Sequence, residues 1–275
     1  TAAKLAEMMV GREVQLTVSR SKSKVAKPLL EVAGLRVLND AAKLVVSDVA
    51  FEVRSGEILA VAGVQGNGQT ELVEALTGLR EVDGGSITLE GTTLTNRSPR
   101  EIASAGVAHI PEDRNRDGMV KGMTIAENYI LNTYHLPQYS KRGLLDRKAI
   151  SAATEKAVKD FDVRTPSIDT DIASLSGGNQ QKVIVAREFS RNVRLVIAAQ
   201  PTRGLDVGSI EYIHRRIVEQ RDSGAAVLIV STELDEVLAL GDRVAVMYEG
   251  RIVGILDAKD ATRERVGLLM GGIVA

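Results

Sequence analysis

The chain has 275 residues, of which 44% are hydrophobic and 26% charged, and its formal net charge is −1. This length suits one large α/β domain with a full core, and the near-neutral charge does not indicate a surface that attracts nucleic acid. The chain has no cysteine, no apolar run near the roughly 18 residues of a membrane span, and no apolar leader at its start, so disulfides, thiolate metal sites, membrane spans and a signal peptide are not predicted.

The start of the sequence has the character of a fragment. Residues 2–10 predict a short helix that ends near Gly11, and residues 19–28 predict a basic, serine-rich linker. The segment AEMMVG at 6–11 resembles GLLMGG at 267–272, near the other end of the chain. We therefore expect 1–28 to be the tail of a preceding, homologous domain plus a linker, followed by one domain over 29–275. A chance match in so short a segment is the alternative.

The remaining pattern predicts an α/β fold. Strand-like runs over 29–61 suit an antiparallel edge and the first central strand of a mixed sheet. Continuous apolar runs at 195–199 and 225–231 predict buried strands of a mostly parallel sheet. Residues from about 124 to 172 are predicted to be mostly helical, with loops near Pro137 and Pro166. Glu249-Gly250 is predicted to join a last pair of strands by a tight turn.

A glycine-rich loop follows the strand EILAVAG and leads into the helical pattern ELVEALTGL. Backbone N–H groups of such a loop, together with a helix N-terminus, bind phosphate oxygens. Gly63, Gly68 and Thr70 match the template G-x-x-x-x-G-K-[ST], but Gln69 stands at the lysine position. An amide supplies only a dipole where lysine supplies a charge, so weak nucleotide binding is expected. The residues expected to contact nucleotide are Gly63, Gly66, Asn67, Gly68, Gln69, Thr70 and Glu71.

Two other interpretations of this loop remain. It could be a tight glycine turn that binds nothing. A dinucleotide-binding fingerprint is disfavoured because Glu71 stands where that pattern has glycine or alanine.

A second phosphate-binding pattern lies at 175–182, which reads LSGGNQQK and precedes the helical VIVAREF. Ser176 offers a hydroxyl, and Gly177 and Gly178 offer backbone N–H groups at a helix N-terminus. A serine N-cap followed by two glycines is the simpler alternative. The segment resembles the signature motif of ABC-type ATPases, and its continuation with Asn179 and Gln180 resembles the form typical of simple-sugar and nucleoside importers.

Other motifs follow in the order of the resembled family, over residues 29–272. The segment 200–206 resembles the Walker B end and D-loop, with Asp206 in the latter. Glu112 stands where the family has its Q-loop, and Thr232 stands at the position of the switch histidine. HIPEDRNRDGM and AAQPTRGLDVG look most similar to the second domain of nucleoside-type importer ATPases. The resemblance implies a helical subdomain over about 115–185.

Several positions depart from an active member of that family. Ala199 and Gln200 replace the Asp that orients Mg²⁺ and the Glu that acts on water, and Thr232 replaces the histidine. Glu112 is an anion near the expected phosphates, which is electrostatically unhelpful. No aromatic residue between 28 and 50 is present to stack on adenine. An engineered Glu→Gln change is an alternative for Gln200 alone. We expect no metal ligands and impaired hydrolysis.

In the resembled family each ATP lies between the P-loop of one domain and the signature of the other. The resemblance therefore implies that this chain supplies its signature, with Ser176, Gly177, Gly178, Asn179 and Gln180, to an ATP on the preceding domain of the same polypeptide. Glu112 and Asp206 are also expected to contact nucleotide. Its own site is expected to bind ATP weakly, with Mg²⁺ possible, and the isolated domain to be inactive or nearly so. An autonomous ATPase of related fold, or a scaffold that binds no nucleotide, are the alternatives.

The resemblance also implies a cellular setting. The expected partners are transmembrane permease subunits and, indirectly, an extracytoplasmic substrate-binding protein, with no nucleic acid. The expected location is the cytoplasmic face of the cell membrane, as a peripheral protein.

Overall fold

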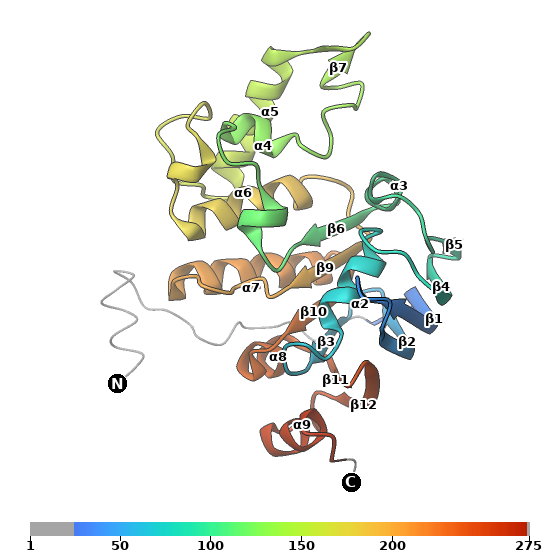
Figure 1. Cartoon of the computed structure of the whole chain (residues 1–275). Helices are drawn as coiled ribbons and strands as arrows, with labels where there is room; N and C mark the ends of the chain where they lie inside the picture. The colour runs from blue at the N-terminus through green and yellow to red at the C-terminus, as the bar shows by residue number, and fades with distance from the viewer. Residues whose placement is uncertain (1–24, 274–275) are drawn as a thin grey trace, which may run out of the picture. The chain divides into compact units, whose positions relative to one another are not determined.

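A computed structural model describes residues 25–273. The predicted helix at 2–10 and most of the predicted linker lie outside the described residues. The chain divides into two compact units. The sheet unit contains the described residues through 109 together with 193–201 and 214–273, and the helical unit contains 110–192 and 202–213. Figure 1 labels most of the helices and strands of both units.

The sheet unit contains a six-stranded sheet of order β12-β11-β3-β10-β9-β6 and a four-stranded sheet of order β2-β1-β4-β5. In the first, β10 runs parallel to both β3 and β9, and β11 runs parallel to β3 and antiparallel to β12. The strands of the first sheet are β3 (Ile58–Ala62), β6 (Val107–Ile110), β9 (Leu195–Ala199), β10 (Ala226–Ser231), β11 (Arg243–Tyr248) and β12 (Arg251–Asp257). Those of the second are β1 (Pro28–Leu38), β2 (Leu44–Arg54), β4 (Gly84–Leu89) and β5 (Thr92–Thr93).

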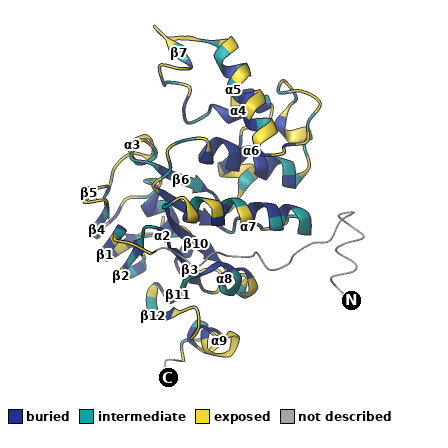
Figure 2. Ribbon diagram, turned by 180° about the vertical axis from the view of Figure 1, so that it is seen from behind, coloured by how far each residue is buried: buried dark blue, intermediate teal, exposed yellow. Residues whose placement is uncertain are grey.

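One hydrophobic core joins the two sheets. Alternate residues of a strand point to opposite faces, and Leu59, Val61, Leu228 and Val230 all belong to this core. Helix α2 (Gln69–Leu76) contacts β1, β2 and β9, so it packs against both sheets. The strands β3, β9 and β10 are buried along their whole length, and the strands labelled β3 and β10 are dark blue in Figure 2. The remaining helices of this unit are α3 (Pro99–Ser104), α8 (Leu234–Leu240) and α9 (Arg263–Met270).

The helical unit is built around α6 (Gly177–Phe189), which packs on α4 (Ile125–Tyr129) and α5 (Arg147–Asp160). It also contains a π-helical turn η1 (Arg114–Gly118), a 3₁₀ turn η2 (Ile172–Ser174) and a small hairpin of β7 (Ser140–Lys141) and β8 (Leu144–Leu145). Helix α7 (Val207–Asp222) begins in this unit and ends in the sheet unit.

The α/β fold with a parallel core sheet, antiparallel strands and helices is confirmed. The buried strands predicted at 195–199 and 225–231 are β9 and β10, and Glu249-Gly250 joins β11 to β12. Two details differ from expectation. The antiparallel strands β1 and β2 form a sheet of their own with β4 and β5. The stretch 124–172 is less helical than expected, because the β7–β8 hairpin separates α4 from α5.

Candidate nucleotide-binding site

Three neighbouring parallel strands of the sheet unit end at one edge. Ala62 of β3 pairs with Ser231 of β10, and Val230 pairs with Ala199 of β9. The residues that follow these ends are Gly63, Thr232 and Gln200. In open α/β sheets, ligands bind at the carboxyl ends of the strands, so the phosphate-loop, catalytic and switch positions predicted from the sequence share one edge.

The loop after β3 has the backbone of an anion cradle. Gly66 and Gly68 have φ of 91° and 94°, which side chains larger than glycine rarely tolerate. A Cβ on Gly68 would also collide with the carbonyl oxygen of Val45, so this position accepts only glycine. Helix α2 starts after Gly68 without a side-chain cap, which leaves first-turn N–H groups for another acceptor.

The side chain of Gln69 is folded back into this loop. It is 7% exposed and packs against Gly63, and its Nε2 has no hydrogen-bond partner. A buried donor without a partner costs free energy, and a phosphate oxygen would satisfy it. The loop 63–70 contains no lysine or arginine. The residues therefore fit a phosphate through amide and backbone dipoles, without a cation.

Asn67 ties the loop to the turn between β11 and β12. The N–H of Glu249 donates to Asn67 Oδ1 at 2.9 Å, and the N–H of Gly250 donates to the Asn67 carbonyl at 3.1 Å. Gly250 in turn accepts from the N–H of Ser47 at 2.8 Å. The loop thus has a defined shape without a ligand.

Gln200 and Thr232 hydrogen-bond to each other at this edge. Gln200 Nε2 donates to Thr232 Oγ1 at 3.1 Å, and Gln200 Oε1 accepts from the N–H of Thr232 at 3.3 Å. Gln200 has a left-handed φ of 46°, a conformation that costs a side chain energy and is concentrated at functional sites. A carboxamide cannot take a proton from water, so this pair lacks a general base.

The same edge of the sheet offers few ligands for a Mg²⁺ ion. Ala199 is 4% exposed and carries a methyl group where a carboxylate would be needed. Within residues 25–273 no group of three or more His, Cys, Asp or Glu side chains could hold a metal. Thr70 contributes one hydroxyl on the loop. The residues present do not fit a tightly held metal ion.

The signature positions lie at the N-terminus of α6 in the helical unit. Ser176 is the N-cap residue, with φ −61° and ψ 154°, but its side chain makes no capping hydrogen bond. Asn179 Nδ2 donates to Ser176 Oγ at 3.1 Å, and Asn179 Oδ1 accepts from the N–H of Arg164 at 2.9 Å. Gln180 Nε2 donates to the carbonyl of Ile172 at 3.3 Å, so its side chain supports the helix from within.

Asp206 lies beside Gly178 at this end of α6. A Cβ on Gly178 would be 3.1 Å from Asp206 Oδ2. The carboxylate of Asp206 accepts from the N–H of Ser209 at 3.0 Å and from its hydroxyl at 2.7 Å. Burial raises the pKa of Asp206, but hydrogen bonds from Ser209 and from the backbone of Asp206 and Gly208 together outweigh burial and lower it. Asp206 is therefore an ionised cap for the first turn of α7.

Glu112, which is expected to be an anion near the phosphates, has an ion-pair partner in the structure. Its Oε1 lies 2.8 Å from Nη1 of Arg203, within the helical unit. The carbonyl of Arg203 accepts in turn from Arg114 Nη1 at 3.0 Å. The charge of Glu112 is thus neutralised locally. The sequence analysis assigned no role to either arginine, although Arg114 stands in the segment PEDR and Arg203 in PTRG.

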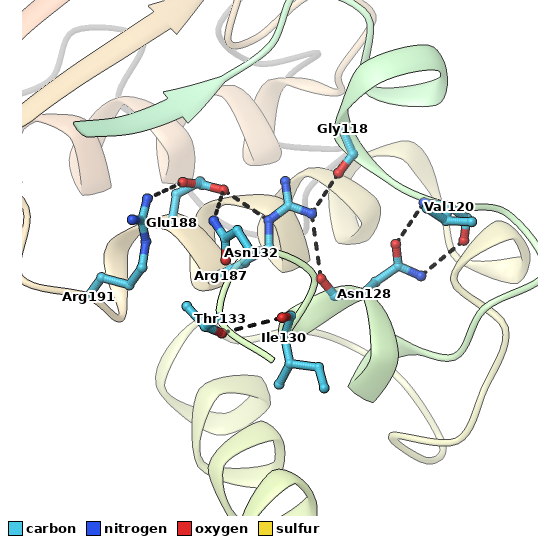
Figure 3. Close-up of polar contacts among 9 residues, drawn as sticks. All are labelled: Gly118, Val120, Asn128, Ile130, Asn132, Thr133, Arg187, Glu188 and Arg191. Carbon is cyan, nitrogen blue, oxygen red and sulfur yellow. Dashed lines mark hydrogen bonds and ion pairs between the residues drawn. The ribbon is translucent and has the colours of Figure 1, made fainter. Parts of the chain in front are cut away.

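A buried ionic cluster anchors the other end of α6 (Figure 3). Glu188 accepts from Arg187 Nε at 2.9 Å, from Arg191 Nη2 at 2.6 Å and from Asn132 Nδ2 at 2.9 Å. Arg187 also donates to the carbonyl of Gly118 at 2.8 Å. Burial raises the pKa of Glu188, but the two arginines outweigh burial and hold it below its ordinary value. The cluster therefore fixes α6 to the segment 118–132.

Comparison with known proteins identifies the family. The family described as "ABC transporter" matches residues 46–203. The chain belongs to the ABC transporter family. This ABC transporter chain resembles the structure of an ATP-binding cassette of an ABC transporter. The TM-score is 0.72 and the identity 22%, and the match covers 90% of this chain and 96% of that one. A nucleotide-free ATP-binding cassette gives 0.70 and 22%, over 88% and 95%. At this identity the two structures confirm the fold alone.

Two curated relatives are closer in sequence. The nucleoside import ATP-binding protein NupA of Lactococcus lactis subsp. cremoris (strain MG1363) is 48% identical over 272 residues, covering 99% of this chain and 54% of that protein. The guanosine import ATP-binding protein NupO of Bacillus subtilis (strain 168) is 45% identical, over 98% and 52%. The ABC transporter chain thus spans about half the length of these relatives. Residues 25–273 contain no helix long and apolar enough to cross a membrane.

Proposed function

We propose that this chain is the second nucleotide-binding half of the ATP-binding protein of an ABC importer for nucleosides or simple sugars. It presents Ser176 and the N-terminus of α6 to an ATP that a preceding domain of the same polypeptide holds. Its own phosphate loop binds ATP weakly and does not turn it over. The import function is supported by the names of the similar proteins, and the two-half arrangement is supported by the chain's matching about half of each.

The observation that carries the asymmetric role is the Gln200–Thr232 pair. The edge of β9 and β10 presents an amide and a hydroxyl that satisfy each other, where hydrolysis needs a base. Ala199 beside them removes the metal ligand as well. This mutual fit also favours Gln200 as the natural residue over an isolated Glu→Gln change.

The setting follows from the family. Transmembrane permease subunits would hold the protein at the cytoplasmic face of the membrane, and an extracytoplasmic binding protein would act through them. ATP is the proposed nucleotide, and any Mg²⁺ at this chain's own loop would be held mainly by the nucleotide.

The test uses the two-domain protein assembled with its permease. Ser176→Glu places a charge and bulk at the N-terminus of α6 and is expected to abolish ATP hydrolysis. Ser174→Glu, at the exposed end of the preceding turn η2, is the control and should leave hydrolysis near the wild-type rate. Gln69→Lys should also change hydrolysis little.

Other outcomes distinguish the alternatives. If ATP hydrolysis changed with Gln69→Lys and not with Ser176→Glu, the proposed roles of the phosphate loop and the signature would be reversed. Steady ATP turnover by the isolated chain would indicate an autonomous ATPase. Calorimetry that detects no heat with millimolar Mg-ATP would indicate a scaffold.

A further inference from the structure

Arg114 lies against the first turn of α6. Its Nη2 is 2.8 Å from the point where a Cβ on Gly177 would be, so the guanidinium occupies the space that this glycine leaves. Its Nη1 donates to the carbonyl of Arg203 at 3.0 Å, which holds the side chain in place. All three residues belong to the helical unit.

The charge of Arg114 is only partly balanced by its neighbours, since the carboxylate of Asp113 interacts with it electrostatically. Among the residues that the structure describes, Arg203 pairs with Glu112 and Arg116 pairs with Asp117, but no carboxylate forms an ion pair with Arg114. Its Nε is buried and has no hydrogen-bond partner.

The nearby carboxylates are already engaged. Asp113 accepts from the N–H groups of Asn115 and Arg116 at 2.8 and 3.2 Å, and Asp206 accepts from Ser209. Among the described residues, neither carboxylate hydrogen-bonds to the guanidinium of Arg114.

The position is electrostatically unfavourable without a ligand. A helix N-terminus carries a partial positive charge and unpaired N–H groups, so a cation there is repelled. Ser176 does not cap these groups. Guanidinium and helix end thus present donors side by side, and one phosphate oxygen would accept from both.

We propose that Arg114 is a second phosphate-binding residue of the signature, contacting the terminal phosphate of the nucleoside triphosphate held by the preceding domain. This inference rests on the proposed function. It adds to the signature of this chain a full positive charge that the backbone N–H groups and Ser176 do not provide. Arg203 is a positioning residue for it, because its carbonyl fixes one arm of the guanidinium.

The first experiment measures ATP hydrolysis by the two-domain protein with its permease over a range of Mg-ATP concentrations. Arg114→Gln is expected to lower kcat/KM about ten- to hundredfold, the range for losing a charged hydrogen bond. Arg114→Lys should retain an intermediate rate because it keeps the charge but not the fork of donors. Arg116→Gln is the matched control, since Arg116 lies on the same turn but pairs with Asp117, and it should leave kcat/KM unchanged.

The second experiment distinguishes a direct contact of the guanidinium with phosphate from a purely structural role of Arg114. Millimolar guanidinium should partly restore hydrolysis by Arg114→Ala, and methylammonium should restore less. Equal rates for Arg114→Gln and Arg116→Gln would overturn the proposal. So would an Arg114→Ala protein that guanidinium does not restore while Arg114→Lys is equally inactive.

Failure of this inference is distinguishable from failure of the proposed function. If Ser176→Glu is inactive and Arg114→Gln behaves like Arg116→Gln, only the role of Arg114 is wrong. If Ser176→Glu is fully active, the signature does not act as proposed.

Discussion

Gln200 and Thr232 satisfy each other across the ends of β9 and β10, with Gln200 Nε2 donating to Thr232 Oγ1 and Gln200 Oε1 accepting from the Thr232 N–H. The pair uses both the donor and the acceptor of the amide. A carboxylate at position 200 could only accept, so the amide is the better match to this neighbour.

Gln200→Glu alone is expected to give no ATP hydrolysis by the isolated chain. Even with a carboxylate at position 200, the site has no metal ligand at position 199, which is Ala199, and no histidine at position 232, which is Thr232. Phosphate release should stay at the background of a matched Gln65→Glu variant, which changes an exposed residue of the phosphate loop. Steady turnover by Gln200→Glu would show that the missing base is the sole defect.

Gln69→Lys is expected to tighten ATP binding to the isolated chain by about tenfold or more, because it adds a full charge at the start of α2. Titration calorimetry measures the change. Gln65→Lys places the same charge on an exposed part of the loop and should have a smaller effect. Equal tightening by both variants would mean that overall charge, not the buried position of Gln69, decides affinity.

Glu188→Gln is expected to lower the free energy of unfolding at neutral pH by about 3 kcal/mol, because it leaves Arg187 and Arg191 partly buried without a counter-charge. The pKa of Glu188 is lowered in the folded state. Its stabilisation is therefore present above the unfolded pKa of about 4.3 and is lost as pH falls through the folded value.

Urea denaturation at several pH values tests this prediction. The difference between the wild-type chain and Glu188→Gln should narrow below about pH 4. Glu155→Gln changes an exposed glutamate on α5 and should change the free energy of unfolding little at any pH. A difference that is independent of pH would mean that the charge of Glu188 contributes nothing.

The Glu112–Arg203 pair is expected to contribute at most about 1 kcal/mol to stability, because the Arg203 side chain is 56% exposed and water screens the attraction. A double-mutant cycle of Glu112→Gln and Arg203→Gln measures the coupling from thermal or urea unfolding. A coupling free energy several times larger would mean that the pair stabilises the fold strongly, beyond neutralising the charge of Glu112.

The strands and loops were predictable where the local pattern determines them. The apolar runs of β9 and β10 and the turn at Glu249-Gly250 are encoded by adjacent residues, and the structure confirms them. The β7–β8 hairpin was missed because strands of two residues leave no periodicity to detect.

The polar contacts were much less predictable. Glu112 and Arg203 are 91 residues apart, and Asn67 and Glu249 are 182 apart. Side chains so distant along the chain meet only after the strands between them have paired. The sequence could name Gln200 and Thr232 as neighbouring positions, but their hydrogen bonds depend on the register of β9 with β10. The assignments of site residues to roles remain predictions.

The link from Asn67 to Glu249 and Gly250 has a practical consequence for shortened forms of the chain. The conformation of the phosphate loop depends in part on hydrogen bonds to the turn between two strands near the carboxyl terminus. A protein cut before β11 would keep every residue of the glycine-rich motif, yet the loop would lose the turn that braces it. Deletion mapping would then report a nucleotide-binding defect for a region that need not touch the nucleotide.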